Sequence, residues 1–582
     1  MPRIIRTIQN LINQSQMHLR RITKALLIAG LLAHGQSFAA DKDPAPGAAA
    51  RLQWWREARF GLFIHWGPVS LKGTEISWSR ANSNPACPNK GPIPVEVYDH
   101  LYQEFNPTNF NAAQWASVAK EAGMRYVVLT AKHCDGFCLW PTKTIDYHIG
   151  ATPFRRDVCR ELAAAVQQAG LRLGWYYSPM DWFDPDCRTE RNPAYVKRMQ
   201  GQLRELLTHY GRIDVLWFDW DGGTIPWDQE NTYRLVRAAQ PRIIINNRLE
   251  CSFGGLSADR YIGPNADYQT PEQVIGAFDD QHPWETCMTL GTQWSWKPDD
   301  DIKSVKDTIR ILAKCVGGDG NLLLNVGPMP TGEIEPRQVE VLKGVGAWLD
   351  KFGASVYGTR GGPFKPGRYG ASTCKGKTVF LHVFNWPAES LKLPLIPAKV
   401  LKGRVLNGGK ATIHQNDVGL EISVAAGDRD PVDTVVALEL DRPANRLSPI
   451  AVPGDISLTK GTKAKASNVH QGQAQYGAEM AVDGNDETRW ATDSGTRTAW
   501  LEVDLGRPMK FSQATLAEAF PERVRRFELQ WLDGTEWKTI CTGDTIGEWW
   551  TRRFNPVTAR QVRLNILEAT EGPTIWEFQL FP

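Results

Sequence analysis

The chain has 582 residues, of which 42% are hydrophobic and 23% are charged. At roughly 100 to 200 residues per domain this length predicts several domains, and the ordinary composition excludes a disordered chain, a collagen-like rod and a coiled coil. Lys and Arg number 67 and Asp and Glu 64, and five of the basic residues precede residue 41, where no acid stands. The remaining chain is nearly neutral and therefore offers no general electrostatic attraction to a polyanion. Nucleic acid is not expected as a partner.

Residues 17–40 have the pattern of a secretory signal peptide, with a basic head, an apolar stretch from Ala25 to Ala33 and a small-residue end at Phe38-Ala39-Ala40. The apolar stretch is much shorter than the roughly 20 residues that cross a membrane, and no later segment supplies such a run. We therefore expect residues 1–40 to be a signal peptide of a protein exported to the periplasm or the extracellular space, without a membrane span. An uncleaved membrane anchor is the alternative.

The 10 cysteines all follow residue 86 and show no paired CxxC spacing, so no metal site is predicted from them. Export permits disulfides, and their pairing stays open.

From residue 50 to 355 short apolar runs alternate with longer helical segments, the pattern of successive βα units around a parallel sheet. Predicted helices include 112–123, 159–170 and 197–211, each of which ends at Gly, as helix C-termini prefer. The alternation predicts a (β/α)8-type barrel in residues 41–357, whose active site would lie in the loops after the strands. The expected strands are 60–66, 126–130, 171–178, 215–219, 243–247 and 322–326.

The sequence VLWFDWDGG ends the fourth of these strands, and its Trp217, Asp219 and Asp221 point to one side of an extended chain. A carboxylate among aromatic residues is costly unless it is partnered, and imidazole and guanidinium groups stand at other predicted strand ends. Two carboxyl groups that flank an acetal are the usual means of glycoside cleavage. We therefore predict Asp219 as the nucleophile of a glycosidase, with Asp221 as the reserve. The 23 Trp of the chain suit sugar stacking as well as core filling.

Several multi-residue blocks between about residues 50 and 445 carry a family resemblance. RFGLFIHWG, KHCDGFCLW, RDVCREL, GWYYSPMDW, LRELLTHYGRIDVLWFDW and PWETCMTLGTQWSW stand in an order that resembles the α-L-fucosidases of glycoside hydrolase family 29. The resemblance implies an exo-acting enzyme that hydrolyses terminal α-L-fucosyl linkages with retention, through a covalent glycosyl-enzyme intermediate. Its substrate would be a fucosylated oligosaccharide or glycoconjugate, and catalysis would require no cofactor or metal.

The same resemblance implies roles for individual residues. Asp219 of LWFDW stands at the position of the nucleophile. The acid/base is either Glu272, in DYQTPEQ, or Glu285, in PWET, and Glu272 is favoured because the bacterial pattern places this residue about fifty positions past the nucleophile. The positions implied to bind the sugar are His65, Trp78, His133, Tyr177, Trp217, Arg248 and Glu285.

Two departures from the family pattern bear on the substrate. Relatives carry two consecutive histidines where this chain has His133-Cys134, and they carry an adjacent Glu-Trp pair where this chain has Glu75-Ile76-Ser77-Trp78. A thiol is a poor replacement for an imidazole donor. The alternatives are therefore a related barrel glycosidase that acts on another sugar, such as α-L-galactose, or a glycan-binding protein with weakened catalysis.

After Gly358 the helical segments stop and short β-rich runs predict a small antiparallel β-sandwich in residues 358–447. In residues 456–582 the blocks AVDGNDETRWAT, TAWLEVDLG and RFELQWLDGTEWKTI resemble a discoidin-type (coagulation-factor C) jelly-roll, the fold of carbohydrate-binding module family 32. The resemblance implies a glycan-binding domain, with a structural Ca²⁺ in the loop of Asp483, Asn485 and Thr488. The predicted fold class is thus α/β, a (β/α)8-type barrel followed by a small β-sandwich and a C-terminal β-sandwich jelly-roll.

The tryptophans of the last domain allow two interpretations. Trp490, Trp500 and Trp537 are interpreted, with Phe578, as core residues. The pair Trp549-Trp550 is either a sugar-stacking platform or part of the core.

Overall fold

The computed structural model describes residues 47–81, 91–219, 226–250, 263–367, 369–384, 386, 390–452, 457–485, 488–520, 523–547 and 549–582. The predicted signal peptide and the reserve carboxylate Asp221 lie outside the described residues.

The first part of the chain forms the predicted parallel sheet. Seven strands stand in the order β5-β4-β3-β2-β1-β7-β6, and every neighbouring pair is parallel. Six of them match the six strands expected from the sequence, and β6 is an addition. The strands are β1 Phe60–Ile64, β2 Tyr126–Lys132, β3 Arg172–Tyr177, β4 Val215–Phe218, β5 Ile244–Ile245, β6 Glu285–Thr289 and β7 Asn321–Val326.

An irregular segment, residues 267–272, closes this sheet into a barrel. It makes parallel bridges to the end of β5 through Tyr268 and to the β6 side through Gln269 and Glu272. Backbone hydrogen bonds join Asp267 to Ile245 at 2.7 Å and Glu285 to Gln269 at 2.9 Å. Counted with the seven strands, this closing segment makes eight positions around the barrel, which confirms the (β/α)8-type fold.

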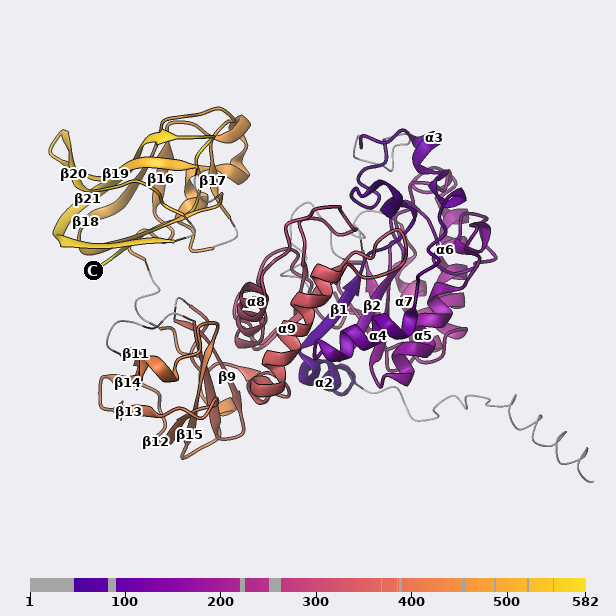
Figure 1. Cartoon of the computed structure of the whole chain (residues 1–582), viewed down its shortest axis with the longest axis horizontal. Coiled ribbons are helices and arrows are strands. Elements are labelled where there is room, and N and C mark those ends of the chain that lie inside the picture. Colours follow the sequence, from indigo (N-terminus) through magenta and orange to yellow (C-terminus); the bar gives the residue numbers. More distant parts are fainter. Residues whose placement is uncertain are drawn as a thin grey trace, which may run out of the picture. The chain divides into compact units, whose positions relative to one another are not determined.

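Helices cover the outside of the sheet (Figure 1). Side chains cap the N-termini of three helices, since Asn111, Asp157 and Ser304 each accept a backbone N–H of the first turn of α4, α5 and α8. Gly123 and Gly170, which end two predicted helices, have the positive φ angles that favour glycine there. The helices are α2 Ala48–Ala58, α3 Val95–Tyr98, α4 Ala112–Glu121, α5 Val158–Gln168, α6 Asn192–Thr208, α7 Gln229–Ala239, α8 Val305–Gly317 and α9 Pro336–Phe352.

Alternation along the strands divides the barrel core into two layers. One apolar cluster fills the lumen and includes Phe63, Tyr176 and Trp217, with Trp55 of α2 in the same cluster. A second cluster lies between strands and helices and includes Ile64 and Tyr177. The side chain of a strand residue therefore faces either the lumen or the helices according to its parity, and this decides which strand-end residues can meet.

A small antiparallel β-sandwich follows, as predicted. A five-stranded sheet, β12-β15-β10-β9-β8, and a three-stranded sheet, β11-β14-β13, enclose an apolar core of their own. The strands are β8 Arg360–Gly361, β9 Gly370–Lys375, β10 Thr378–Val383, β11 Leu391–Pro394, β12 Val400–Val405, β13 Ala411–Gln415, β14 Gly419–Val424 and β15 Thr434–Leu440.

The C-terminal domain is an antiparallel β-sandwich with the strand order β17-β22-β18-β21-β19-β20, and β16 pairs with β18. Trp490 and Phe578 are fully buried in its core, as expected. The expectation for Trp500 and Trp537 is wrong, because both are only half-buried and their rings lie 5.3 and 4.0 Å from the guanidinium of Arg563. The strands are β16 Lys463–Ala466, β17 Trp490–Ala491, β18 Ala499–Glu518, β19 Val524–Asp533, β20 Glu536–Gly543, β21 Trp550–Ala569 and β22 Thr574–Phe581.

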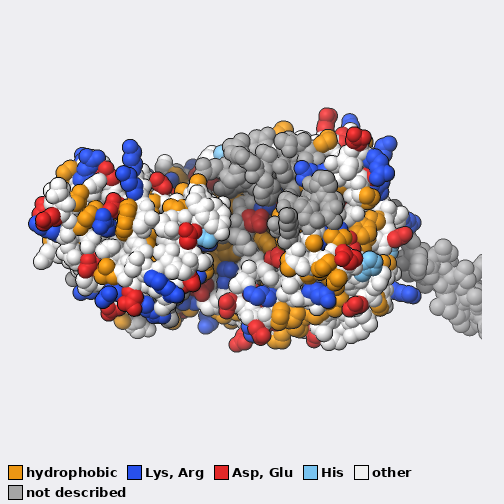
Figure 2. All heavy atoms as spheres, turned by 90° about the horizontal axis from the view of Figure 1, so that it is seen from above, with side chains coloured by type: hydrophobic (Ala, Val, Ile, Leu, Met, Phe, Trp, Pro, Cys, Tyr) orange, Lys and Arg blue, Asp and Glu red, His pale blue; other side chains and the backbone are white. Residues whose placement is uncertain are grey.

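Three further observations concern the described residues as a whole. None of their helices has the length and apolar character needed to cross a membrane. Their eight cysteines carry free thiols, and seven of these are buried. Basic and acidic side chains are interspersed on the described part of the face in Figure 2, in keeping with the near-neutral balance of the chain.

Candidate active site

Two carboxylates and one arginine meet at the C-terminal edge of the barrel. Asp219 directly follows β4, Arg248 follows β5, and Glu272 ends the closing segment. Arg248 Nη1 lies 2.7 Å from Asp219 Oδ1, and Arg248 Nη2 lies 2.7 Å from Glu272 Oε2. Two predicted carboxylates from separate parts of the chain therefore share the guanidinium group of a third predicted site residue.

Arg248 is buried and fixed from several directions. Its Nε donates to Thr270 Oγ1 at 2.9 Å, its Nη2 donates to the Thr270 carbonyl at 3.1 Å, and its guanidinium lies 4.6 Å from the centre of the Trp217 ring. Burial opposes the charge, but Glu272 and Asp219 raise the pKa of Arg248 well above its ordinary value. Loss of this cation would leave two carboxylates without their shared counter-charge.

Tyr176 holds the second oxygen of Asp219. Its hydroxyl donates to Asp219 Oδ2 at 2.6 Å, and its ring stacks on Trp217 with centroids 5.6 Å apart. Burial and the charge of Asp219 raise the pKa of Tyr176 well above its ordinary value, so the hydroxyl keeps its proton and remains a donor. The side chain of Asp219 is 17% exposed and that of Glu272 is 38% exposed. Of the two carboxylates, Asp219 is therefore the more buried and Glu272 the more exposed.

Two histidines, His65 and His133, lie beside Tyr176 in this site. His65 Nδ1 lies 2.6 Å from Asn325 Oδ1, and the ring of Trp294 packs 4.8 Å from the His65 ring. His133 lies flat on Tyr176, with centroids 5.3 Å apart and planes within 4° of parallel. The two imidazoles are 5.6 Å apart.

Both imidazoles are neutral at ordinary pH. Burial and the neighbouring His133 lower the pKa of His65 well below its usual range. Burial lowers the pKa of His133 to about 4, although the charge of Asp219 acts in the opposite direction. A neutral imidazole offers one donor and one acceptor, which is what recognition of sugar hydroxyls needs.

His133 is bonded in turn to a strained residue. Its Nδ1 lies 2.5 Å from Ser77 Oγ, and Ser77 is fully buried with a φ of 58°. This left-handed conformation costs a residue other than glycine about 1–2 kcal/mol. Sequence reasoning noted Ser77 only as part of the split Glu-Trp pair and gave it no role.

Tyr177, predicted as a pocket residue, lies outside this group. Its hydroxyl donates to Gln202 Oε1 of α6 at 2.6 Å, and Lys132 Nζ lies 4.7 Å from the centre of its ring. Neighbouring residues of a strand face opposite sides, so Tyr177 faces the helices and Tyr176 faces the lumen. The tyrosine of the site is Tyr176.

Glu285, predicted as a sugar-binding residue and as the alternative acid/base, lies at the other end of the barrel. It begins β6, accepts a hydrogen bond from Trp55 Nε1 at 3.0 Å and a second from the Tyr126 hydroxyl, and is fully buried. Burial raises its pKa to about 7, against the effect of these hydrogen bonds. The N-terminal edge of the sheet and the C-terminal edge that holds Asp219 are separated by the strands, so Glu285 is corrected to a residue of the barrel floor.

The split Glu-Trp pair serves two separate functions. Glu75 accepts the backbone N–H of Trp294 at 2.8 Å and so holds the segment whose ring packs on His65. Trp78, predicted to bind the sugar, packs its ring 5.3 Å from that of Trp182 and is half-buried.

Cys134, the neighbour of His133 in the chain, is fully buried beside the site. It belongs to the apolar cluster between strands and helices, and its Sγ lies 3.2 Å from Ser178 Oγ. Burial raises the pKa of the Cys134 thiol well above its ordinary value, so the group is uncharged.

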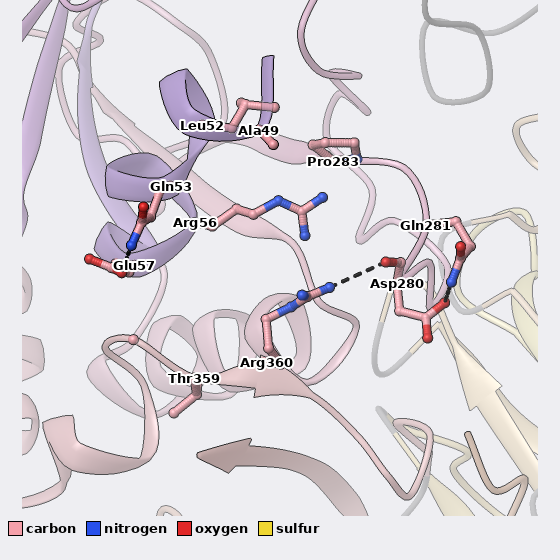
Figure 3. A pocket seen from close by; sticks show the side chains of 11 residues that line it. Ala49, Leu52, Gln53, Arg56, Glu57, Asp280, Gln281, Pro283, Thr359 and Arg360 are labelled. Atoms are coloured by element: carbon pink, nitrogen blue, oxygen red, sulfur yellow. Dashed lines mark hydrogen bonds between the residues drawn. The ribbon is translucent and has the colours of Figure 1, made fainter. Parts of the chain in front are cut away.

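A metal cluster and a separate cavity are the other features that could mark a functional site in the described residues. No cluster of three or more His, Cys, Asp or Glu side chains that could hold a metal occurs in the part of the chain that the structure describes. A cavity of about 610 Å³ lies at the opposite, N-terminal end of the barrel, between α2 and residues 280–283 and 358–360. Figure 3 shows Arg56 and Arg360 pointing toward this space, with Arg360 donating to the Asp280 carbonyl at 3.2 Å. Barrel enzymes carry their active sites at the C-terminal end, where Asp219 lies.

A parallel barrel whose C-terminal edge holds paired carboxylates, an arginine and neutral imidazoles beside aromatic rings defines a barrel glycoside hydrolase. Comparison with known proteins specifies the family. The family model described as Alpha-L-fucosidase matches residues 33–354, which is more than half of the chain, so the chain belongs to the α-L-fucosidase family. A second model, the F5/8 type C domain, matches residues 463–578.

Individual relatives agree with this family. The plasma alpha-L-fucosidase of Rattus norvegicus is 30% identical over an alignment of 383 residues, and the match covers 60% of this chain and 79% of that protein. The structure of alpha-L-fucosidase isoenzyme 1 from Paenibacillus thiaminolyticus is 34% identical, with a TM-score of 0.61, and covers 68% of this chain and 99% of its own. A GH29 alpha-L-fucosidase from Bacteroides thetaiotaomicron, trapped as a covalent intermediate with 2-fluoro-fucosyl fluoride, is 26% identical with a TM-score of 0.60 and covers 69% and 99%.

Proposed function

We propose that this protein is an exported, retaining exo-glycosidase that releases terminal α-L-fucose from glycans. The observation that carries the proposal is the single guanidinium of Arg248 with Asp219 on one side and Glu272 on the other. Family membership supports the sugar, and the covalent intermediate trapped in the Bacteroides thetaiotaomicron relative supports the retaining route.

In the first step, a carboxylate oxygen of Asp219 attacks C1 of fucose while Glu272 gives its proton to the glycosidic oxygen. The bond between C1 and that oxygen breaks, the alcohol leaves, and an ester joins Asp219 to the sugar. In the second step, Glu272 takes a proton from water, whose oxygen attacks C1. The ester breaks, and fucose leaves with the anomeric configuration of the substrate.

Arg248 contacts both reacting carboxyl groups. With both carboxylates ionised, the three charges sum to −1, and each carboxylate lies 2.7 Å from the guanidinium. Once Asp219 has become an ester, Glu272 is the remaining carboxyl group beside Arg248. Tyr176 orients Asp219 throughout, because its hydroxyl is bonded to the oxygen that Arg248 does not hold.

Hydrolysis of 4-nitrophenyl α-L-fucoside by the purified chain from residue 41 onward tests the proposal. We expect release of nitrophenol, with α-L-fucose as the first anomer seen by proton NMR before mutarotation. Matched α-L-galactosides and xylosides test the alternative sugars in the same assay. Turnover of one of these without turnover of the fucoside would replace the proposed substrate, β-L-fucose as the first anomer would contradict retention, and no turnover at all would favour the glycan-binding alternative.

We propose that the C-terminal domain binds glycans and brings the catalytic barrel to its substrate. The match to the F5/8 type C domain supports a binding module. Of the candidate stacking pair, Trp549 is 50% exposed and available to a ligand, whereas Trp550 packs 5.1 Å from Phe527. The interpretation as core therefore applies to Trp550, and the stacking interpretation narrows to Trp549.

We propose further that this domain holds a structural Ca²⁺ in the loop of Asp483, Asn485 and Thr488. Thr488 Oγ1 lies 2.6 Å from Asp483 Oδ2 and 3.0 Å from the Asn485 carbonyl oxygen. Thr488 Oγ1 thus lies within 3.0 Å of a carboxylate oxygen and a carbonyl oxygen. All three are hard oxygen donors of the kind that Ca²⁺ prefers, so the residues fit the ion.

Thermal unfolding of the full chain tests the calcium proposal. A ligand at 100 times its Kd stabilises the folded state by about 2.7 kcal/mol, so millimolar Ca²⁺ is expected to raise the unfolding midpoint of this domain by several degrees over that in chelator. Asp483→Ala removes the difference, and Asp533→Ala, a change of an exposed acid elsewhere in the domain, keeps it. Equal midpoints with and without Ca²⁺ in the unmodified chain would refute the site.

A further inference from the structure

Ser77 belongs to a closed ring of hydrogen bonds beside His133. The Ser77 N–H donates to the Tyr98 hydroxyl at 2.8 Å, the Tyr98 hydroxyl donates to Asp135 Oδ2 at 2.7 Å, and the Asp135 N–H donates to Ser77 Oγ at 2.9 Å. All three residues are buried. Each is fixed by the other two, and the ring holds Ser77 Oγ 2.5 Å from His133 Nδ1.

The direction of the hydrogen bond between Ser77 and His133 follows from this ring. Ser77 Oγ already accepts the N–H of Asp135, and its own proton needs an acceptor, which His133 Nδ1 supplies at 2.5 Å. His133 is neutral, because burial lowers its pKa to about 4, so one of its ring nitrogens carries no proton. Nδ1 is therefore the acceptor, and Nε2 carries the proton.

Asn325 imposes the opposite arrangement on His65. Its Nδ2 donates to the Trp294 carbonyl at 2.7 Å, which fixes the amide so that Oδ1 faces His65 Nδ1 at 2.6 Å. An amide oxygen can only accept, so His65 Nδ1 carries the proton and its Nε2 has the free lone pair.

We propose that Ser77 and Asn325 hold the two neighbouring imidazoles in opposite tautomers, so that His65 presents an acceptor and His133 a donor to adjacent hydroxyl groups of the sugar. The proposal rests on the proposed function and specifies how its pocket recognises the sugar. Ser77 is a positioning residue that acts through His133, since the hydrogen bond on one ring nitrogen determines what the other can do.

The backbone of Ser77 supports a functional reason for the side chain. Its φ of 58° lies in the left-handed region, where glycine is the unstrained choice. A serine kept there at full burial supplies a hydroxyl that glycine lacks. For the same reason Ser77→Gly removes the hydroxyl without adding backbone strain, which makes it a suitable test variant.

The tautomers are measured directly by nitrogen-15 NMR of the full chain labelled on histidine, with the two rings assigned from His65→Gln and His133→Gln. We expect a protonated Nδ1 for His65 and a protonated Nε2 for His133. In Ser77→Gly the His133 signals are expected to change to a mixture of tautomers, while those of His65 stay. The same tautomer on both rings would overturn the proposal, and this result does not depend on which substrate the protein cleaves.

Kinetics on the aryl fucoside give the second measurement. Loss of the hydroxyl donor lets either ring nitrogen of His133 carry the proton, so Nε2 is no longer held as a donor to the sugar. In Ser77→Gly, KM is therefore expected to rise roughly 5- to 50-fold, with a smaller change in kcat. The matched control is Ser79→Gly in the same loop, whose hydroxyl donates to the Glu75 carbonyl and not to a histidine.

These outcomes distinguish the positioning role of Ser77 from the proposed function. An unchanged KM in Ser77→Gly, or an equal rise in Ser79→Gly, would overturn the positioning role. Absence of turnover in the unmodified chain would contradict the proposed function instead, and the NMR signals would still decide the tautomers.

Discussion

Replacing Asp219 with alanine is expected to lower kcat/KM for an aryl α-L-fucoside by at least about 10⁴-fold, because a retaining glycosidase cannot form its intermediate without the nucleophile. The fold should survive the change. Arg248 keeps Glu272 as a partner, so no buried cation is left without an anion. Initial rates and the unfolding midpoint of Asp219→Ala, measured beside the unmodified chain, check both statements.

Azide identifies the role of Asp219 by stereochemistry. In Asp219→Ala an azide ion can occupy the space of the missing carboxylate and attack C1 from the same side. A single displacement of an α-linked leaving group gives β-L-fucosyl azide. Formation of the α-azide, or activity close to that of the unmodified chain, would show that another residue is the nucleophile.

Two adjacent tyrosines provide a matched control for the same site. Tyr176 donates to Asp219, and Tyr177 donates to Gln202 on the helix side of the strand. We expect Tyr176→Phe to lower kcat by roughly 10- to 100-fold, because Asp219 loses a hydrogen bond to its charged form, and Tyr177→Phe to leave kcat nearly unchanged. Equal effects of the two changes would mean that the tyrosines act through the core and not through Asp219.

These tyrosines also show which site residues could be predicted from the sequence and which could not. Asp219 and Arg248 could be predicted because each follows an apolar run at a strand end, and parallel strands bring such ends to one edge. The choice between Tyr176 and Tyr177 depends on the parity of a strand whose bounds a sequence gives only to within a few residues. A shift of one residue exchanges the lumen side for the helix side, so the sequence could indicate a tyrosine at this strand end but not which one.

Glu272 and Glu285 illustrate a second limit. PWETCMTLG is not among the strands expected from the sequence, yet Glu285–Thr289 forms β6, and the segment before it closes the barrel through isolated bridges. Such a segment has no periodic pattern by which a sequence can identify it. Asn325 could have been noticed, since it is a polar residue near the end of the apolar strand NLLLNV. Ser77 could not, because its role depends on a ring of contacts with Tyr98 and Asp135 that no local pattern predicts.

The position of Glu272 leads to the second large expected effect. Glu272→Ala is expected to lower kcat/KM by about 10²- to 10⁴-fold for a fucoside whose leaving alcohol needs a proton, and much less for a 2,4-dinitrophenyl fucoside, whose leaving group departs unprotonated. The difference between the two substrates is the signature of a general acid. It is measured by comparing the ratio of their rates in Glu272→Ala with the ratio in the unmodified chain.

Azide distinguishes this residue from Asp219 as well. With Asp219 intact, the glycosyl ester still forms on the activated substrate, and azide attacks it from the opposite face, so two displacements give α-L-fucosyl azide and a faster turnover. Glu285→Gln is the matched control, because it removes the charge of the competing glutamate at the barrel floor and should neither respond to azide nor discriminate between leaving groups. An azide response in Glu285→Gln with none in Glu272→Ala would reverse the assignment. The geometry argues against that reversal, since Glu272 shares the guanidinium of Arg248 with Asp219, and Glu285 contacts Trp55 and Tyr126 at the N-terminal end of the strands.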